Sequence, residues 1–210
     1  MSYAVKELYT TLQGEGAHTG RRAVFLRFAG CNLWTGREQD RTEAVCTFCD
    51  TDFVGMDGPG GGRFADAEGL AAAVEREWGH TRDHRYVVCT GGEPLLQLDT
   101  ALIEALHARG FEVGVETNGT QAAVPGLDWI CVSPKADAEL ALRQGNELKL
   151  VYPQPLAMPE RFEGLAFDHF FLQPMDGPTQ AENIAAATAY CLANPRWRLS
   201  LQTHKLIGIP

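Results

Sequence analysis

Seven short runs of apolar, β-branched and aromatic residues recur along the chain. They predict strands over 23–29, 85–89, 111–115, 128–132, 147–152, 169–173 and 198–202. Most of these runs are apolar throughout, as is typical of parallel strands covered on both faces. Stretches of helical composition separate several of them, over 65–78, 98–108 and 180–193. This alternation predicts an α/β fold built on a parallel sheet.

The length of the chain limits the kind of parallel sheet it can form. A complete (β/α)₈ barrel typically needs ~250 residues, whereas this chain has 210. The glycine-rich segment 56–64 and the proline-rich segment 152–164 are expected to be connections. There is no internal repeat and no domain boundary. We therefore expect residues 1–210 to form a single domain, a shortened and partly open (β/α) barrel of about six to seven mostly parallel strands.

Composition narrows the class of function. The chain is 45% hydrophobic and 21% charged, as expected of a soluble globular protein. Its net charge of -9 argues against a nucleic-acid partner and favours a small-molecule substrate. The N-terminus lacks a secretory signal, and no apolar run is long enough to span a membrane. We expect a cytoplasmic protein with no membrane partner, whose six cysteines serve as metal ligands, catalytic groups or buried thiols.

Three of the cysteines, Cys31, Cys46 and Cys49, lie in a polar stretch. Three thiolates on one centre leave a coordination position open, which suits an iron–sulfur cluster with one iron available to a ligand. Cys89, Cys131 and Cys191 lie in apolar runs and are expected to be packing residues.

A zinc-stabilised binding module is the alternative for the same cysteines. A closed zinc site needs a fourth ligand, which His18, His80 or His84 could supply. None of these histidines has the spacing found in zinc ribbons and fingers.

Polar groups follow five of the predicted strands directly. In a parallel barrel these strand ends share one rim, where such enzymes place their active sites. The groups are Cys31, Thr90 to Pro94, Glu116 to Asn118, Ser133 to Lys135, and Gln173 with Pro174.

Six motifs occur in order along nearly the whole chain: "YTTLQGEG", "RFAGCN", "CTFCDT", "TGGEP", "ETNGT" and "SPK". Together they resemble the 7-carboxy-7-deazaguanine synthase family of radical S-adenosylmethionine (SAM) enzymes. The aromatic residue before Cys49 matches the C-x3-C-x-aromatic-C signature of that superfamily. The usual gap of three residues is replaced here by fourteen, between Cys31 and Cys46. We expect the cluster loop to bulge outward, since a longer loop costs little free energy.

The resemblance implies a lyase of queuosine biosynthesis. It would contract the ring of 6-carboxy-5,6,7,8-tetrahydropterin to 7-carboxy-7-deazaguanine and release ammonia. Its cofactors would be a 4Fe-4S cluster on Cys31, Cys46 and Cys49, SAM, and Mg²⁺. SAM would accept an electron, yield a 5'-deoxyadenosyl radical that takes a hydrogen from the pterin, and be regenerated. A flavodoxin-like or other low-potential electron donor and a homodimer are also implied, and no side chain is assigned as a general acid or base.

Matching positions give the expected ligand contacts. Contacts to SAM are expected from Phe48, Asp50, Gly91, Gly92, Glu93, Glu116, Ser133, Pro134, Lys135, Gln173 and Pro174. Contacts to the substrate are expected from Leu12, Gln13, Gly14, Glu15, Arg27, Thr90, His204 and Pro210. Arg27 would bind the pterin carboxylate, the alternative being an internal ion pair. Thr51 would bind Mg²⁺, the alternative being an ordinary loop threonine.

The last residues of the chain are apolar, namely Leu206, Ile207, Ile209 and Pro210. We expect this segment to pack against the body of the protein. The Pro210 carboxylate would then accept hydrogen bonds from the pyrimidine side of the pterin, as members of the resembled family suggest; packing alone is the alternative.

A different function stays open beside the synthase. A radical SAM activase that generates a glycyl radical on a partner protein would share the cluster and the "GGE" motif. It would have no use for "LQGEG" or for Arg27.

Overall fold

A nine-stranded sheet forms the body of the protein in the computed structural model, which describes residues 2–210. Its strand order is β3-β1-β2-β4-β5-β6-β7-β8-β9. Seven neighbouring strands are parallel, as the apolar runs predict. They are β2 (Arg22–Phe28), β4 (Tyr86–Gly91), β5 (Glu112–Thr117), β6 (Trp129–Val132), β7 (Gln144–Tyr152), β8 (Ala166–Pro174) and β9 (Trp197–Leu199).

Two further strands extend the sheet beyond the predicted number. β1 (Tyr3–Leu12) pairs with β2 in an antiparallel manner, and β3 (Gly62–Phe64) pairs with the start of β1. The expected total of six to seven strands is therefore too low. β1 lies near the edge, so its outer residues are polar and only half-buried, while β3 is three residues at the end of the glycine-rich segment.

The three expected helices are present. α1 (Ala67–Trp78) links β3 to β4, α2 (Thr100–His107) links β4 to β5, and α3 (Gln180–Ala193) links β8 to β9. α1 and α2 begin at Asp66 and Asp99, whose carboxylates accept hydrogen bonds from backbone amides of the first turn. A short helix, α4 (Thr203–Ile207), was not expected.

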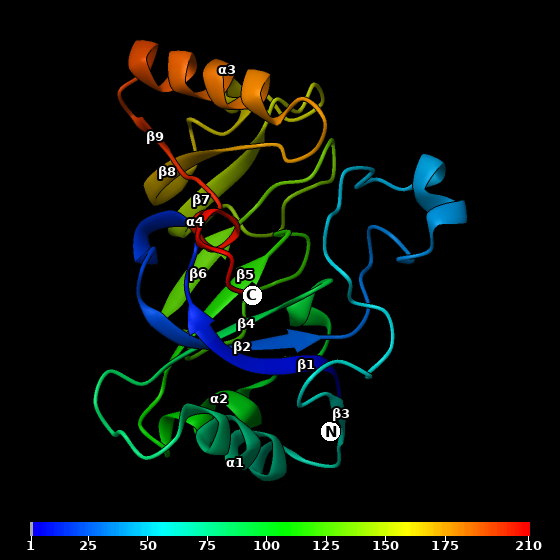
Figure 1. Cartoon of the computed structure of the whole chain (residues 1–210), viewed down its shortest axis with the longest axis vertical. Coiled ribbons are helices and arrows are strands. Elements are labelled where there is room, and N and C mark those ends of the chain that lie inside the picture. The colour runs from blue at the N-terminus through cyan, green and yellow to red at the C-terminus, as the bar shows by residue number, and fades with distance from the viewer. Residues whose placement is uncertain (1) are drawn as a thin grey trace.

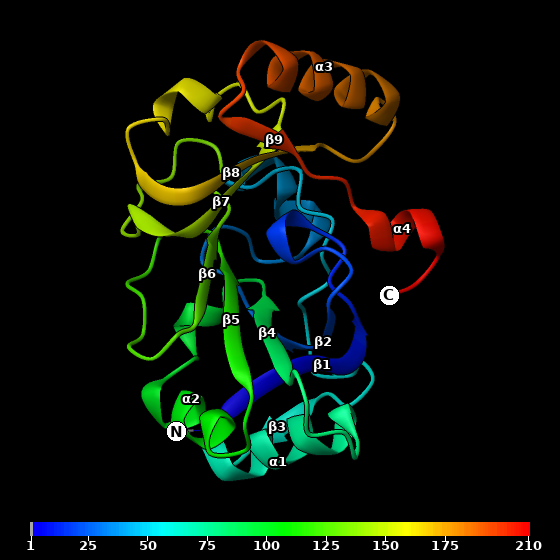
Figure 2. The ribbon, with the colours of Figure 1, turned by 90° about the vertical axis from the view of Figure 1, so that its left-hand side faces the viewer.

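The sheet curls without closing (Figure 1). Figure 2 shows α1 and α2 at one end and α3 at the other, with irregular chain over the strands between them. Two irregular segments meet at the opening. The Thr203 amide donates to the Gly14 carbonyl at 2.9 Å, and the Gly16 amide donates to the Ser200 hydroxyl at 2.9 Å. The residues that follow β9 therefore bind the loop that follows β1.

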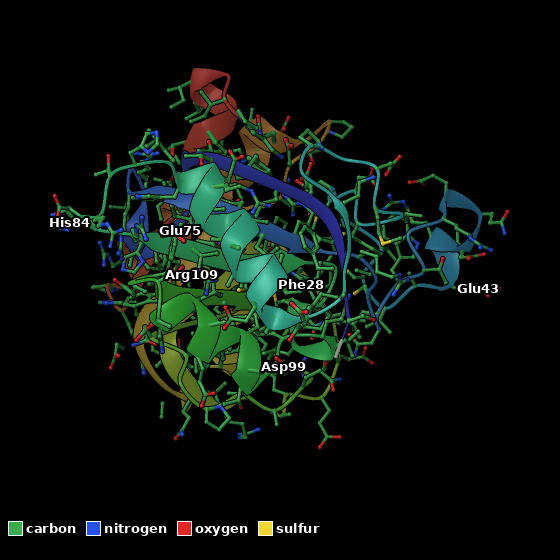
Figure 3. All side chains as sticks on the ribbon, turned by 90° about the horizontal axis from the view of Figure 1, so that it is seen from below. Phe28, Glu43, Glu75, His84, Asp99 and Arg109 are labelled. Carbon is green, nitrogen blue, oxygen red and sulfur yellow. The ribbon has the colours of Figure 1, made fainter. Side chains whose placement is uncertain are left out.

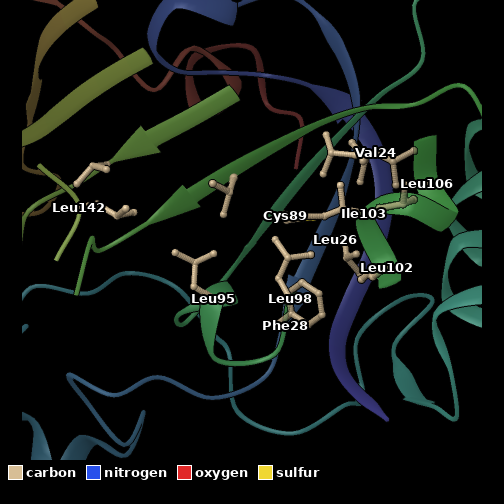
Figure 4. Packing of buried hydrophobic residues seen from close by; sticks show 14 of the residues in the cluster. Val24, Leu26, Phe28, Cys89, Leu95, Leu98, Leu102, Ile103, Leu106 and Leu142 are labelled. Atoms are coloured by element: carbon tan, nitrogen blue, oxygen red, sulfur yellow. The ribbon is translucent and has the colours of Figure 1, made fainter. Parts of the chain in front are cut away.

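One apolar cluster lies between the sheet and its helices. In Figure 4, Leu102 and Leu106 of α2 face Leu26 of β2 and Cys89 of β4. Figure 3 shows α1 and α2 side by side across the same face, with Glu75 on α1. The helices thus cover the sheet with apolar side chains, and the opposite, concave face is free to carry polar groups.

Within residues 2–210, none of the helices combines the length and the hydrophobicity that crossing a bilayer requires.

Replacing a buried leucine of α2 tests this packing. Leu102 is 0% exposed, whereas Leu192 on α3 is 80% exposed. We expect Leu102→Ala to lower the free energy of unfolding by about 2–5 kcal/mol, because it leaves a cavity in the core. Leu192→Ala is the control and should change the free energy little. Urea unfolding followed by circular dichroism measures both, and similar losses in the two variants would contradict the described packing.

Candidate active site

A cavity of about 590 Å³ opens at the carboxyl ends of the parallel strands. All of the predicted site residues line it except Cys31, Glu93 and Pro134. They come from the loop after β1, from β2, from the cysteine loop and from the ends of β4, β5, β6 and β8. The rim predicted from the sequence therefore exists as one cavity, and α4 adds His204 to its wall.

The cysteine loop forms one end of the cavity. Cys46 is buried, while Cys31 and Cys49 are half-buried. A hydrogen bond from the Cys46 thiol lowers the pKa of Cys49 to about 6 against the effect of burial. The same hydrogen bond and burial raise the pKa of Cys46, and burial raises the pKa of Cys31. The hydrogen bond thus favours the thiolate of Cys49, which is the form that binds metals.

The segment between Cys31 and Cys46 projects from the body of the protein (Figure 1), as its length predicts. It contains a 3₁₀ helix, Glu38–Glu43, and Glu43 marks its tip in Figure 3. Arg41 fixes the projection to the cysteine pair: its guanidinium donates to the carbonyls of Thr47 and Cys49, each at 3.0 Å.

Within residues 2–210, no group of three or more His, Cys, Asp or Glu side chains is arranged to hold a single metal ion. A four-iron cluster differs from such a site, because each of its cysteines binds a different iron atom.

The glycine pair at the end of β4, Gly91 and Gly92, packs on the chain segment that leads from β2 to Cys31. A Cβ atom on Gly92 would lie 2.3 Å from the Gly30 carbonyl oxygen and 2.7 Å from the Cys31 Cβ. A Cβ atom on Gly91 would lie 2.3 Å from the Phe28 carbonyl oxygen. The glycines are therefore needed for contact between two backbone segments, and this contact places Cys31.

Glu93 lies behind the wall of the cavity. Its side chain is 0% exposed and accepts hydrogen bonds from the Leu95 amide, the Thr117 hydroxyl and the Asn118 amide. Burial raises the pKa of this carboxyl group. The Glu93 side chain thus joins the β4 and β5 loops, and the expected contact of this residue with SAM stays a prediction.

A basic group stands between the cysteine loop and β6. The Lys135 ammonium donates to the Ser133 hydroxyl at 2.7 Å and lies 5.7 Å from the centre of the Phe48 ring. It contributes to lowering the pKa of Cys49. These three predicted residues form one wall beside the thiols.

A second charged group lies deeper, inside the barrel. The Lys149 ammonium lies 2.5 Å from Glu15 Oε2 and 3.3 Å from Glu116 Oε1. The Gln13 amide donates to Glu116 Oε1 at 2.8 Å and accepts from the Glu15 amide at 3.1 Å. Burial raises the pKa of Glu15, but the charge of Lys149 and hydrogen bonds from Lys149 and Gln202 lower it to about 2. Glu15 is therefore ionised at neutral pH.

Arg27 both forms an ion pair and lines the cavity. Its Nε donates to Glu7 Oε1 at 2.7 Å, and its Nη2 donates to the Tyr9 hydroxyl at 3.1 Å. The internal ion pair that was the alternative is thus present, while Nη1 makes neither of these bonds.

The C-terminal segment differs from the expectation. Leu206 is 73% exposed and Ile207 is 61% exposed, so these side chains do not pack against the body. Polar contacts hold the segment instead. The Lys205 ammonium bridges Asp50 at 2.8 Å and Asp176 at 2.6 Å, and the Thr11 hydroxyl donates to the Pro210 carbonyl oxygen at 2.8 Å. Pro210 lines the cavity, as expected.

Sequence reasoning missed two lysines in the cavity wall. Lys6 binds Asp52, Asp57 and the Val54 carbonyl, which ties the segment after Thr51 to β1. Lys149 was missed although a signal was available: it is a charged residue inside the apolar run "ELKLVY". A charge in a strand covered on both faces needs a partner.

Comparisons with known proteins agree with one another. The chain is 70% identical over 209 residues to the 7-carboxy-7-deazaguanine synthase of Bradyrhizobium diazoefficiens and 66% identical over 210 residues to that of Caulobacter vibrioides. Both matches cover 100% of each chain. A solved structure, the crystal structure of QueE from Escherichia coli, is similar with a TM-score of 0.72 and 29% identity, covering 96% of this chain and 94% of that one. No family model matches the chain.

An alanine at position 92 tests how Cys31 is placed. Because its Cβ would overlap the Gly30 carbonyl and Cys31, Gly92→Ala should shift the loop and lower the iron bound after anaerobic reconstitution. Gly164→Ala is the matched control, since a Cβ there meets no atom within 4 Å. Iron and sulfide analysis measures the effect. Full iron content in Gly92→Ala would show that this contact does not place Cys31.

Proposed function

The chain belongs to the 7-carboxy-7-deazaguanine synthase family of radical SAM lyases, and on that premise we propose that it converts 6-carboxy-5,6,7,8-tetrahydropterin to 7-carboxy-7-deazaguanine with release of ammonia. The enzyme acts in the queuosine pathway. These relatives share the name 7-carboxy-7-deazaguanine synthase, which favours the synthase over the alternative of a glycyl-radical activase.

One observation supports this proposal above the others. A single cavity holds thiols at one end, a half-buried pair of carboxylates with a buried lysine in the barrel, and an arginine on β2. A radical SAM reaction on a pterin carboxylate needs places for a cluster, for SAM and for the substrate within one water-excluding space.

The cysteine loop fits a 4Fe-4S cluster. Cys46 and Cys49 line the cavity, and the contact of Gly92 with the Cys31 Cβ brings the third thiol to the same end. Cys89 and Cys131 are 0% and 2% exposed, as expected of packing residues. When bound, the cluster and SAM would supply an electron and a radical that abstracts hydrogen. Cys31, Cys46 and Cys49 would hold the cluster.

The neighbouring wall fits SAM. Gly91 and Gly92 expose backbone to the cavity, and Ser133 and Lys135 offer donors to a carboxylate. Glu116 offers Oε2 to a ribose hydroxyl, because Gln13 and Lys149 occupy Oε1. Further contacts are proposed for Phe48, Asp50, Gln173 and Pro174, which also line the cavity.

The loop after β1 and the neighbouring strands fit the pterin. The ionised Glu15 accepts hydrogen bonds, as the N–H groups of a pterin ring require. Arg27 Nη1 would bind the pterin carboxylate, and Thr90 and His204, which also line the cavity, would add contacts to the substrate. The His204 ring contacts Gly14, where a Cβ would lie 2.0 Å from Nδ1. The loop is thus held against α4, which keeps Glu15 in place.

Thr51 fits a magnesium site in which most ligands come from substrate and water. It follows Cys49 and Asp50 and lines the cavity. The Lys6 contacts to Asp52 and Asp57 hold the segment after it, so the hydroxyl has a defined position.

The proposed enzyme needs an electron donor, and it is expected to form a homodimer in the cytoplasm. A flavodoxin-like or other low-potential donor would deliver the electron near the projecting cysteine loop. A homodimer would cover exposed apolar residues such as Leu192. The reducing cytoplasm suits free thiols.

Turnover tests the function directly. The protein, reconstituted without oxygen and supplied with SAM, Mg²⁺, reductant and the tetrahydropterin, should form 7-carboxy-7-deazaguanine, detected by chromatography and mass spectrometry. Cys31→Ala should abolish SAM cleavage, since its cluster lacks a ligand, while the control Cys191→Ala should retain it. Full cleavage by Cys31→Ala would refute the ligand assignment, and a wild type without product would refute the substrate.

Mutation of Thr51 tests the magnesium site. Thr51→Ala should weaken the stimulation of turnover by Mg²⁺ without lowering the iron content, because it removes a hydroxyl ligand. Thr51→Ser retains the hydroxyl and should behave as the wild type. A Mg²⁺ titration of the initial rate compares the three proteins. If the alanine variant keeps the wild-type dependence, Thr51 is an ordinary loop residue.

A further inference from the structure

Lys149 occupies an unusual position for a lysine. It lies in the middle of β7 and is 4% exposed, with its ammonium group inside the barrel. Its two hydrogen-bond partners come from distant parts of the chain: Glu15 follows β1, and Glu116 lies in β5. A buried ammonium group is costly unless it is paired and hydrogen-bonded. Both conditions are met here by carboxylates that face the cavity.

These contacts form a closed ring with Gln13. Lys149 binds Glu15 and Glu116, while Gln13 donates to Glu116 and accepts from the Glu15 amide. The ring joins the substrate side of the cavity to its SAM side. Gln13 is neutral, so Lys149 is the member of the ring that supplies a positive charge to the two carboxylates.

Other titratable groups surround the ring. Glu147 lies on β7, Cys131 on β6 and His204 on α4. Burial raises the pKa of Glu147 and of Cys131, so both are held towards their neutral forms. Glu147 is also held by the Ala17 amide at 3.0 Å. The Lys149 ammonium donates its hydrogen bonds to Glu15 and Glu116, so these two carboxylates are its direct partners.

We propose that Lys149 is a positioning residue shared by the two ligands, which holds Glu15 towards the pterin and Glu116 towards SAM. The proposal rests on the proposed function and adds to it a residue outside the recognised motifs. Lys149 touches neither ligand in this role; it acts through the two carboxylates.

Removal of the ammonium group has a consequence that depends on pH. Burial raises the pKa of Glu15, and Lys149 is the main group that opposes this effect. Without Lys149 the pKa of Glu15 rises, so the group takes up a proton and accepts hydrogen bonds poorly. Binding of the pterin is then weak at low pH and recovers as the pH rises through the new pKa. In the wild type Glu15 stays ionised over that whole range.

The test uses the full chain with its cluster reconstituted anaerobically and no reductant, so that no turnover occurs. The probe is 6-carboxypterin, an oxidised analogue whose fluorescence reports binding. At about pH 6, Lys149→Met should bind the probe about tenfold or more weakly than the wild type, because a charged hydrogen-bond partner is lost. The ratio of the two dissociation constants should fall as the pH rises towards about 9, where buried carboxyl groups deprotonate. Titration of the probe itself affects both proteins equally, so it does not change the ratio of their dissociation constants.

Arg85→Met is the matched control. Arg85 is a buried cation, 6% exposed, whose Nη1 lies 2.9 Å from Glu75 Oε1, and it is not part of the cavity wall. This variant should lose stability but bind the probe as the wild type does at every pH. A Lys149→Met protein with a ratio that does not change with pH would overturn the proposal, because a merely structural role predicts a constant loss. The wild type should bind the probe, and the turnover assay with the tetrahydropterin itself tests the proposed substrate separately.

A second pair of variants removes the charge of Glu15, so that the effect of Lys149 on Glu116 is measured alone. The double variant Glu15→Gln with Lys149→Met is compared with Glu15→Gln alone, and the affinity for SAM is measured. The double variant should bind SAM about fivefold or more weakly than the single one, because Glu116 has lost its charged partner. Equal SAM affinities would overturn the role of Lys149 at Glu116.

Discussion

The opening in the barrel is the constraint on which the site depends. The sheet does not close, so the loop after β1 enters the barrel and binds its inner wall. The Ala17 amide donates to Glu147 Oε2 at 3.0 Å, and Gly16 lies so near that a Cβ would be 2.0 Å from Glu147 Oε1. Gly16 also adopts a φ of +65°, which glycine accepts at little cost. With this loop in place, Gln13 and Glu15 face the cavity.

The parts of the fold that could be predicted from the sequence are the strands buried on both faces. Strands covered on both faces give continuous apolar runs, and these located the seven parallel strands. β1 was not predicted because its residues alternate between the core and the polar cavity. β3 was not predicted because a strand of three residues is too short to show a periodic pattern. α4 is five residues long, and its apolar side chains face solvent. Its apolar sequence therefore suggested packing that does not occur.

The site was predictable at the strand ends, where the motifs stand. In the barrel interior the sequence indicates that Lys149 needs a charged partner, but it does not indicate that this partner is Glu15, which lies 134 positions away. The curl of the sheet brings such residues together, and a local sequence pattern does not predict this curl. Glu93 shows the opposite case: a motif residue whose carboxylate is used to join two loops. Position in a motif predicts proximity to the site, but the direction of a side chain is set by its partners.

The attachment of α4 has a consequence for how the cavity exchanges its contents. The ion pairs of Lys205 are partly exposed, so dissolved salt screens them, and each contributes little free energy. The core beneath the helices is held by apolar packing and does not respond to salt in this way. Ionic strength therefore acts on the mouth of the cavity separately from the stability of the fold. The residence time of a ligand in the enzyme can change with the medium while the barrel itself stays intact.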